Sequence, residues 1–354
     1  MSSPFDQHNA ALHLEGFELE GGWKVGPLNG RDPSATGGMF SVSYMATRSD
    51  GRQSFVKVID LITAIGDIDR LQETVNEYIS ERDLLIMCGQ HRLSHVVTAI
   101  GHGQFVLPGY MLGQVNYIVF ELAASDVRVA LSQGNSIDVV LRLELLHNLA
   151  VGLRQLHQRE VAHQDLKPSN FLIFPDTSNG GSQGKLADLG RAYRHGHPSM
   201  HDSYVRPGDK GYAPPEQLYG HEYPDMRVRR FSADLYQLGN LACFMFGGVT
   251  MNALLTLELA PEHHWDSFGD EYEEALPYLQ DAYGRAIARL RENLPQEVRG
   301  PLSSMISYLC EPDGTRRGHP AAHKGNGSGF ALQRVVSEID LLARRTATGA
   351  AGTS

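Results

Sequence analysis

The alternation of apolar and polar residues divides the chain into two parts, and the first part is mostly β. Residues 23–59 alternate apolar and polar positions around two turn-rich stretches, GPLNGRDPSATGG and RSDGRQ, which predicts strands joined by turns. The apolar residues of 65–89 recur every three or four positions, so this stretch predicts an amphipathic helix that ends at Gly89. A further pair of strands is expected in 95–107 and 116–123.

Beyond Ala124 the pattern becomes helical. Residues 137–158 and 331–345 predict helices, and residues 232–248 are apolar nearly all round, which is typical of a helix buried in the centre of a large domain. We therefore expect an α+β protein with a small antiparallel β half, carrying one helix, and a larger helical half. The expected divisions are an N-terminal extension at 1–20, the small half at 21–122, the large half at 123–345 and a flexible tail at 346–354.

Composition narrows the class of protein. The formal net charge of -10 argues against binding nucleic acid, which needs a basic face. No apolar run approaches the roughly 18 residues that cross a bilayer, and the chain starts with polar residues, so we expect no membrane segment and a cytoplasmic location. The three cysteines, each flanked by apolar residues, predict buried thiols rather than disulfides.

A short polar cluster carries the first chemical signal. The stretch VAHQDLKPSNFLIF, residues 161–174, places His163, Asp165, Lys167 and Asn170 within eight residues, between two apolar runs. Four alternating polar residues on so short a stretch do not fit a half-buried strand. They predict a loop whose side chains converge on a site, and the alternative is a polar β-turn with satisfied hydrogen bonds.

This stretch resembles the catalytic loop of eukaryotic-type protein kinases, H-R-D-L-x-x-x-N, and the resemblance covers roughly residues 23–320. The resemblance implies the bilobal kinase fold and a phosphoryl-transfer activity. This reaction requires the protein to position the reactants in line and to neutralise charge on the phosphate oxygens. Asp165 would accept the proton of the attacking hydroxyl, Lys167 would stabilise the γ-phosphate, and Asn170 would hold Mg²⁺. The loop and the compact GDKGYAPPEQLYG segment look like those of the bacterial members. Many of these also carry a membrane span and an extracellular sensor, which we do not expect here.

Asp188 lies in KLADLGRA, at the position of the family's D-F-G motif. The resemblance implies that it holds Mg²⁺ against the β- and γ-phosphates, because Mg²⁺ prefers hard oxygen ligands. Alone, Asp-Leu-Gly is a common turn, but 18 residues after Asn170, with a strand between, it becomes specific. The insert PDTSNGGSQG in this interval reads as a solvent loop.

Lys57 lies inside the apolar strand SFVKVID, where an unpaired ammonium is costly. The following helix offers Glu73, Glu77 and Glu81, and the family pairs its strand lysine with one such glutamate. We choose Glu81 because, in the family, the residue four positions after the paired glutamate packs against the D-F-G region and must be apolar. Leu85 satisfies this for Glu81, whereas for Glu77 that residue would be the charged Glu81. Lys57 would then bind the α- and β-phosphates; the alternative is an exposed lysine on an amphipathic strand.

The phosphate-covering loop departs from the family pattern G-x-G-x-F-G. In the best register, over residues 36–46, Thr36 and Ser41 replace the first and third glycines. Backbone amides of such a hairpin still cradle phosphates, although close approach is hindered at these two positions. The resemblance assigns four loop residues to ATP binding: Gly37, Gly38, Phe40 and Ser41.

The adenine site is also altered. The resemblance makes Phe120 the gatekeeper, gives backbone contacts with the adenine edge to Glu121 and Ala123, and adds Leu172 to the ATP-binding residues. Phe55 and Ser43 stand where the family has alanine and valine. Both changes alter the pocket, so ATP is expected to bind more weakly or in a shifted position.

Other positions bear on structure, regulation and specificity. Glu216 should pair with Arg317, and Asp234 should cap the catalytic loop. Lys167 follows the serine/threonine pattern, but Asp209 stands where those kinases usually have threonine. Gln164 replaces the arginine that binds an activation-loop phosphate, so activity is expected without phosphorylation of this loop.

Two further clusters leave alternatives open. His195, His197 and His201 raise the idea of a metal site, but a solvated, mobile loop fits better because no carboxylate or thiol completes a ligand set. The basic stretch RVRRF, residues 227–231, suits either an acidic partner surface or, preferably, a plain solvated helix end.

Three functions compete. The first is an ATP- and Mg²⁺-dependent serine/threonine protein kinase that phosphorylates protein substrates, with autophosphorylation included. The second is a pseudokinase scaffold, which Phe55, Gln164 and the altered loop favour. The third is a small-molecule kinase of the aminoglycoside or choline type, although those enzymes normally lack the Lys167-Pro168 step and the A-P-E-like segment.

Overall fold

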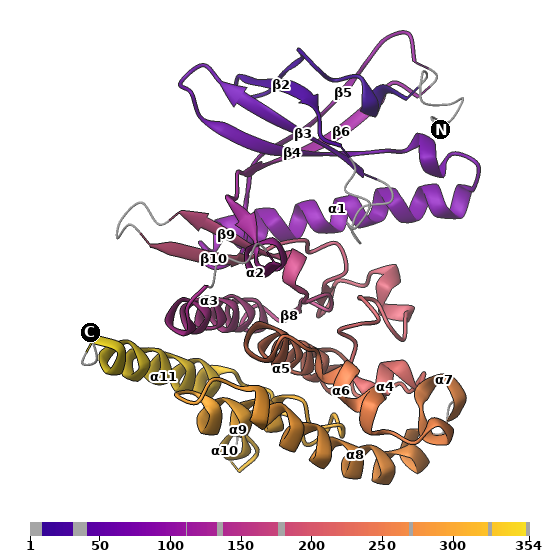
Figure 1. Cartoon of the computed structure of the whole chain (residues 1–354). Coiled ribbons are helices and arrows are strands. Elements are labelled where there is room, and N and C mark those ends of the chain that lie inside the picture. Colours follow the sequence, from indigo (N-terminus) through magenta and orange to yellow (C-terminus); the bar gives the residue numbers. More distant parts are fainter. Residues whose placement is uncertain are drawn as a thin grey trace. The chain divides into compact units, whose positions relative to one another are not determined.

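The computed structural model describes residues 9–30, 41–110, 112–132, 137–175, 181–268, 272–324 and 328–351 (Figure 1). The chain forms two compact units, Met1–Ala124 and Ser125–Ser354. The first consists mainly of an antiparallel sheet and the second mainly of helices, which confirms the predicted α+β, bilobal fold. Each unit is described by itself.

The small unit is built on a six-stranded antiparallel sheet with the order β1-β2-β3-β4-β6-β5. Its elements are β1 (Glu18–Leu19), β2 (Trp23–Leu28), β3 (Ser41–Arg48), β4 (Gln53–Ile59), β5 (Ala99–Val106), β6 (Gln114–Glu121) and the helix α1 (Ile68–Gln90). The side chain of Asp67 caps α1 by accepting a hydrogen bond from Arg70 N. The helix continues through Gly89, where the sequence predicted its end, because Gly89 keeps helical geometry and His91 caps the last turn.

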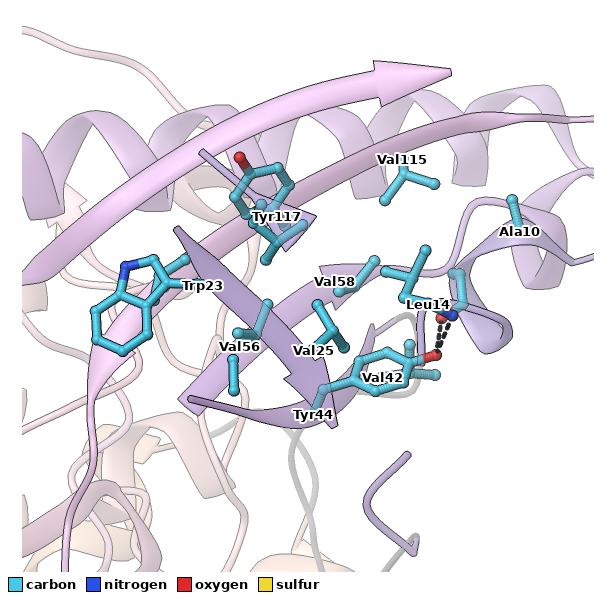
Figure 2. Packing of buried hydrophobic residues seen from close by; sticks show 14 of the residues in the cluster. Ala10, Leu14, Trp23, Val25, Val42, Tyr44, Val56, Val58, Val115 and Tyr117 are labelled. Atoms are coloured by element: carbon cyan, nitrogen blue, oxygen red, sulfur yellow. Dashed lines mark hydrogen bonds between the residues drawn. The ribbon is translucent and has the colours of Figure 1, made fainter. Parts of the chain in front are cut away.

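Alternating strand residues form the core of the small unit, and the chain ahead of β1 completes it. The 3₁₀ turn η2 (Ala10–Leu12) and Leu14 are packed against the sheet, and Leu14 is fully buried. Figure 2 shows Tyr44 of β3 reaching this segment, where its Oη donates to Ala11 O at 2.6 Å and accepts from Leu14 N at 3.4 Å. Residues 9–20, expected as an extension, therefore belong to the folded unit.

The large unit contains ten α-helices among its described residues: α2 (Val127–Ser132), α3 (Val139–His157), α4 (Pro215–Leu218), α5 (Ser232–Gly247), α6 (Met251–Glu258), α7 (Trp265–Phe268), α8 (Tyr272–Asn293), α9 (Arg299–Leu309), α10 (Pro320–His323) and α11 (Gln333–Ala351). Two small antiparallel sheets accompany them. One has the order β10-β9-β7, from Ser182–Leu186, Phe171–Pro175 and Ser125–Asp126; the other pairs β8 (Val161–Ala162) with β11 (Tyr193–Arg194).

Helix α5 lies at the centre of this unit, as its uniformly apolar sequence predicted. It packs against α3, α8 and α9, and nearly all of its side chains are buried (Figure 1). A π-helical turn, Arg227–Phe231, leads directly into it. Cys243 of α5, Cys310 and, in the small unit, Cys88 are buried thiols that are not joined in disulfides, as predicted.

Two other stretches differ from expectation. Ser182–Gly184, expected as part of a solvent loop, form the start of β10. Glycine is needed at 184 because a Cβ there would lie only 2.3 Å from Cζ of the Phe171 ring. Helix α11 packs along α3 and continues to Ala351, past residue 345 where the folded domain was expected to end.

The length and apolar character of the helices bear on whether any of them could cross a membrane. Across the described residues, no individual helix has the length and apolar composition to cross a bilayer, and the bent pair Arg227–Gly247 and Met251–Glu258 meets that requirement only when both helices are taken together.

Candidate active site

The catalytic-loop sequence is held in place by the buried start of α5. Asp234, fully buried, accepts hydrogen bonds from the backbone N of His163 at 2.7 Å and of Gln164 at 2.8 Å. Its Oδ2 also lies 2.8 Å from Nε2 of His157. A buried carboxylate is costly unless such donors surround it. Asp234 thus caps the loop, as predicted.

Asp165 is the centre of the converging polar side chains. Its Oδ2 pairs with Lys167 Nζ at 2.9 Å and accepts from Asn170 Nδ2 at 3.1 Å, and its Oδ1 accepts from Asp209 N at 2.9 Å. All three loop residues are 6% exposed. Both carboxylate oxygens are therefore oriented, so the loop presents a fixed base next to a fixed cation.

Asn170 and Asp188 are brought next to each other by backbone contacts. Ala187 N donates to Asn170 O at 2.9 Å, and Ala187 O lies 3.0 Å from His163 Nε2, so Asp188 follows directly beside the loop. Asn170 Nδ2 donates to both Asp165 O and Asp165 Oδ2, which leaves its Oδ1 for another partner. An amide oxygen and a carboxylate fit Mg²⁺, a hard cation with oxygen ligands.

Backbone strain also marks this region. Among the described residues, four other than glycine have positive φ, and two of them, Gln164 (69°) and Asp188 (61°), lie in the two motifs. The left-handed region costs a residue with a side chain about 1–3 kcal/mol, and such residues cluster at functional sites. The hydrogen bonds made by Asp234 and Ala187 offset this cost.

In the small unit, Lys57 and Glu81 form the ion pair that the sequence predicted. Lys57 Nζ lies 2.8 Å from Glu81 Oε2 and 3.0 Å from Oε1. The Glu81 side chain is 6% exposed and that of Lys57 is 29% exposed. The pair fixes the ammonium at the middle of β4 while leaving it accessible to a ligand.

The residues assigned to adenine lie mostly at the end of β6. Phe120, buried, pairs across the strands with Phe55, and their ring centroids are 6.4 Å apart. Glu121 is the last residue of β6, and Ala123 follows it; both are half-buried. Phe55, which was expected to alter the adenine pocket, is thus a direct neighbour of Phe120, the residue assigned as gatekeeper.

The remaining ATP-binding assignments are spread over both units. Ser41 opens β3 opposite Ile59 in the small unit, and Leu172 is half-buried in β9 of the large unit, opposite Asp126. Gly37, Gly38 and Phe40 lie outside the described residues.

The basic stretch 227–231 is not the solvated helix end that was expected. Arg230 is fully buried, and its Nη2 donates to the backbone carbonyls of His201, Asp202 and Tyr204. His201 is also buried, with Nδ1 3.0 Å from Arg191 Nη1, so the solvated-loop reading fails for this histidine. Within the described part of the chain, no group of three or more histidine, cysteine or acidic residues suits a metal.

Sequence reasoning missed Arg230 and Gln237. Gln237 of α5 accepts from Leu166 N at 3.0 Å and donates to Gln164 O at 2.9 Å, so it holds the catalytic loop beside Asp234. Its place one helical turn after Asp234 was the available signal, since residues three apart share a helix face. Arg230 gave no such signal, because a charged residue in a basic run resembles a surface residue.

Comparison with known proteins agrees with this geometry. A family model described as "Protein kinase domain" matches residues 36–317. The serine/threonine-protein kinase PknF of Mycobacterium tuberculosis (strain H37Rv) is 29% identical over 188 residues, which are 51% of this chain and 38% of that protein. The CBL-interacting protein kinase 20 of Oryza sativa subsp. japonica is 30% identical over 198 residues, 49% of this chain and 38% of its own.

A third relative is a much longer protein than this chain. The serine/threonine-protein kinase/endoribonuclease IRE1 of Oryza sativa subsp. japonica is 28% identical over 178 residues, 49% of this chain and 16% of that protein. The matches therefore cover well under half the length of these relatives. The chain belongs to the protein kinase family. The three relatives named here include serine/threonine kinases of plant and bacterial origin.

Proposed function

We propose that this protein is an ATP- and Mg²⁺-dependent serine/threonine protein kinase. The observation that carries the proposal is the fixed, buried set of Asp165, Lys167 and Asn170, in which both oxygens of one carboxylate are oriented by a cation and by N–H donors. Phosphoryl transfer needs this kind of preorganised positioning and charge more than it needs covalent chemistry.

Each polar residue then has a task in the transfer. Asp165 accepts the proton of the acceptor hydroxyl, and Lys167 balances charge on the transferred phosphoryl group. Lys57, held by Glu81, binds the α- and β-phosphates of ATP. Asn170 and Asp188 hold Mg²⁺, which when bound neutralises phosphate charge.

We further propose that activity does not depend on phosphorylation of the activation loop. The Gln164 side chain is neutral and donates to Arg230 O at 2.8 Å, so position 164 offers no cation to a phosphate. Ser199→Ala, Ser203→Ala and Tyr204→Phe should each keep activity. Loss of activity in all three would contradict this part of the proposal.

A second candidate is a nucleotide-binding scaffold without transfer activity. Its support is Phe55, which stands where the family has alanine and whose ring centroid lies 6.4 Å from that of Phe120. Against it stands the full set of chemically competent residues, Lys57, Asp165, Asn170 and Asp188. We therefore favour the active enzyme.

The test is transfer of label from radioactive ATP to a basic and an acidic acceptor protein, in the presence of Mg²⁺ or of excess chelator, followed by identification of the phosphoamino acid. Asp165→Asn should lower kcat by about 10²- to 10⁴-fold. The control is Asp340→Asn, a change of the same kind at an exposed side chain of α11.

Phosphoserine or phosphothreonine that requires both Mg²⁺ and Asp165 would support the proposal. If no protein is labelled while ATP still raises the melting temperature, the scaffold is the better reading. Label found only on a small hydroxylated acceptor would indicate a small-molecule kinase instead.

A further inference from the structure

A buried guanidinium contacts the activation segment, residues 188–216 of the large unit, and makes no ion pair with a described carboxylate. Arg230 is fully buried in the π-helical turn that leads into α5. Burial, and next the charge of Arg229, lower its pKa to about 10, so it still carries its charge at neutral pH. A buried charge is retained only where polar groups compensate for its lost hydration.

Backbone carbonyls of the activation segment provide that compensation. Arg230 Nη2 donates to Asp202 O at 2.8 Å, to Tyr204 O at 3.1 Å and to His201 O at 3.3 Å. The 3₁₀ turn Met200–Ser203 carries two of these carbonyls, and Ser199 closes its start in a reciprocal capping box with Asp202. The segment thus contacts one side chain of the turn that precedes α5 through three of its carbonyls.

The same guanidinium is joined to the catalytic loop. Arg230 Nη1 donates to Gln164 Oε1 at 3.3 Å, and Gln164 Nε2 donates back to Arg230 O at 2.8 Å. Gln164 directly precedes Asp165, and its strained backbone is fixed by Asp234 and Gln237. A shift of the activation segment would therefore be transmitted through one contact to the residue beside the base.

We infer that Arg230 is a positioning residue, which holds the activation segment and the catalytic loop in one arrangement by binding the carbonyls of 201–204 and the Gln164 side chain together. The family usually supplies a cation for this segment from position 164, where this chain has glutamine. Here the cation comes from the π-helical turn that precedes α5, and it binds carbonyl oxygens rather than a phosphate. This inference rests on the proposed kinase function for its kinetic consequence only.

The principal test replaces Arg230 with methionine, which keeps much of the side-chain volume and removes the donors. We expect kcat to fall by about ten- to a hundredfold, as for a small misplacement of catalytic groups, while KM for ATP is unchanged. Amide hydrogen exchange of residues 199–206 should become faster. The matched control is Arg227→Met, three positions away in the same turn, whose side chain is 54% exposed and pairs with Glu160; it should change none of these quantities.

Two further variants separate positioning from general stability. Gln164→Leu combined with Arg230→Met should lose less than the sum of the two single losses, because both changes break the bond from Arg230 Nη1 to Gln164 Oε1. Arg230→Lys keeps the charge but lacks the planar fork of donors, so it should restore only part of kcat and of the exchange protection. If Arg230→Met fails to fold, Arg230→Lys and Gln164→Leu are judged by the same two readouts.

The inference would be overturned if Arg230→Met kept the kcat of the wild type and the same rate of amide exchange in residues 199–206. Additive losses of kcat in the double variant would also overturn it. If the wild-type protein phosphorylates nothing, the proposed function fails, and the exchange measurement still decides whether Arg230 orders the segment. Phosphatase treatment of the wild type should leave both readouts unchanged, and a loss would show that a phosphate performs the task.

Discussion

Arg317 and Glu216 form a two-pronged ion pair between residues 101 positions apart, with Nη1–Oε1 at 2.8 Å and Nη2–Oε2 at 2.9 Å. Both side chains are buried. Burial alone would lower the pKa of Arg317, but the Glu216 carboxylate outweighs it and raises the pKa above its ordinary value. The large unit therefore contains two buried arginines with different partners. Arg317 forms an ion pair with a carboxylate, whereas Arg230 donates hydrogen bonds to backbone carbonyls.

Breaking the Arg317–Glu216 pair should destabilise the large unit strongly. We expect Arg317→Met to lower the free energy of unfolding by about 3–5 kcal/mol, because it leaves a buried carboxylate without its partner. Urea unfolding measures the change. Arg344→Met serves as the control, since this exposed arginine pairs with Asp340 on the same helix and should contribute under about 1 kcal/mol. Equal effects of the two substitutions would contradict the prediction.

Lys57 and Glu81 should act as one unit in nucleotide use. Hydrogen bonds to charged groups are worth about 1.5–3 kcal/mol, so Lys57→Met and Glu81→Gln should each lower kcat/KM for ATP by about ten- to a hundredfold. The double variant should lose little more than either single one. Glu77→Gln, on the same helix, is the matched control and should leave kcat/KM near the wild-type value. Fully additive losses would show that the two residues act separately.

Asp209 should influence which acceptor peptides are used. Its backbone N binds Asp165, and its Oδ1 accepts from Gly211 N at 2.8 Å, so asparagine can keep both contacts while removing the charge. We expect Asp209→Asn to reduce the preference for acceptors with arginine or lysine beside the target hydroxyl by about two- to fivefold, the scale of a partly screened charge pair. The measurement is kcat/KM for matched basic and neutral peptides. An unchanged ratio would exclude Asp209 from this selection.

Tyr44 should contribute to alkaline loss of stability in the small unit. Burial raises its pKa to about 12 from the ordinary 10.0, so the stability it gives is complete below pH 10 and is lost as the pH rises towards 12. Tyr44→Phe leaves Ala11 O without its donor and should cost about 1–3 kcal/mol at neutral pH. The difference from wild type should narrow above pH 10.

Urea unfolding of wild type and Tyr44→Phe over the alkaline range checks this trend. Tyr278→Phe is the control, because Tyr278 is half exposed and its loss should give a curve parallel to that of the wild type. A gap for Tyr44→Phe that is constant up to pH 12 would mean that Tyr44 does not titrate as proposed.

Local patterns predicted the features that depend on neighbours in sequence. Period-two alternation located β3 and β4, and the apolar stretch 232–248 located the central helix. The spacing of apolar residues after Glu81 also selected it correctly from three glutamates as the partner of Lys57. These predictions succeeded because each rests on a repeat or a spacing that the sequence itself contains.

Features that depend on distant partners were not predictable in this way. Arg230 is part of a basic run, and nothing local indicates that carbonyls of 201–204 will surround it. The segment 9–14 is too short to show periodicity, yet Tyr44 and Asp60 anchor it to the small unit. Ser182–Gly184 look like loop residues because Gly184 has no side chain, and only the ring of Phe171 explains the glycine.

The long separation between Glu216 and Arg317 also sets an order of events during synthesis. Glu216 leaves the ribosome 101 residues before its partner, which at about 5–20 residues per second is a delay of roughly 5–20 s. Until Arg317 emerges, the Glu216 carboxylate lacks the guanidinium with which it forms its buried ion pair, so burying it is unfavourable. We expect the end of the activation segment to stay unfolded and exposed to solvent in the nascent chain throughout this interval. It should become folded only once residue 317 is available.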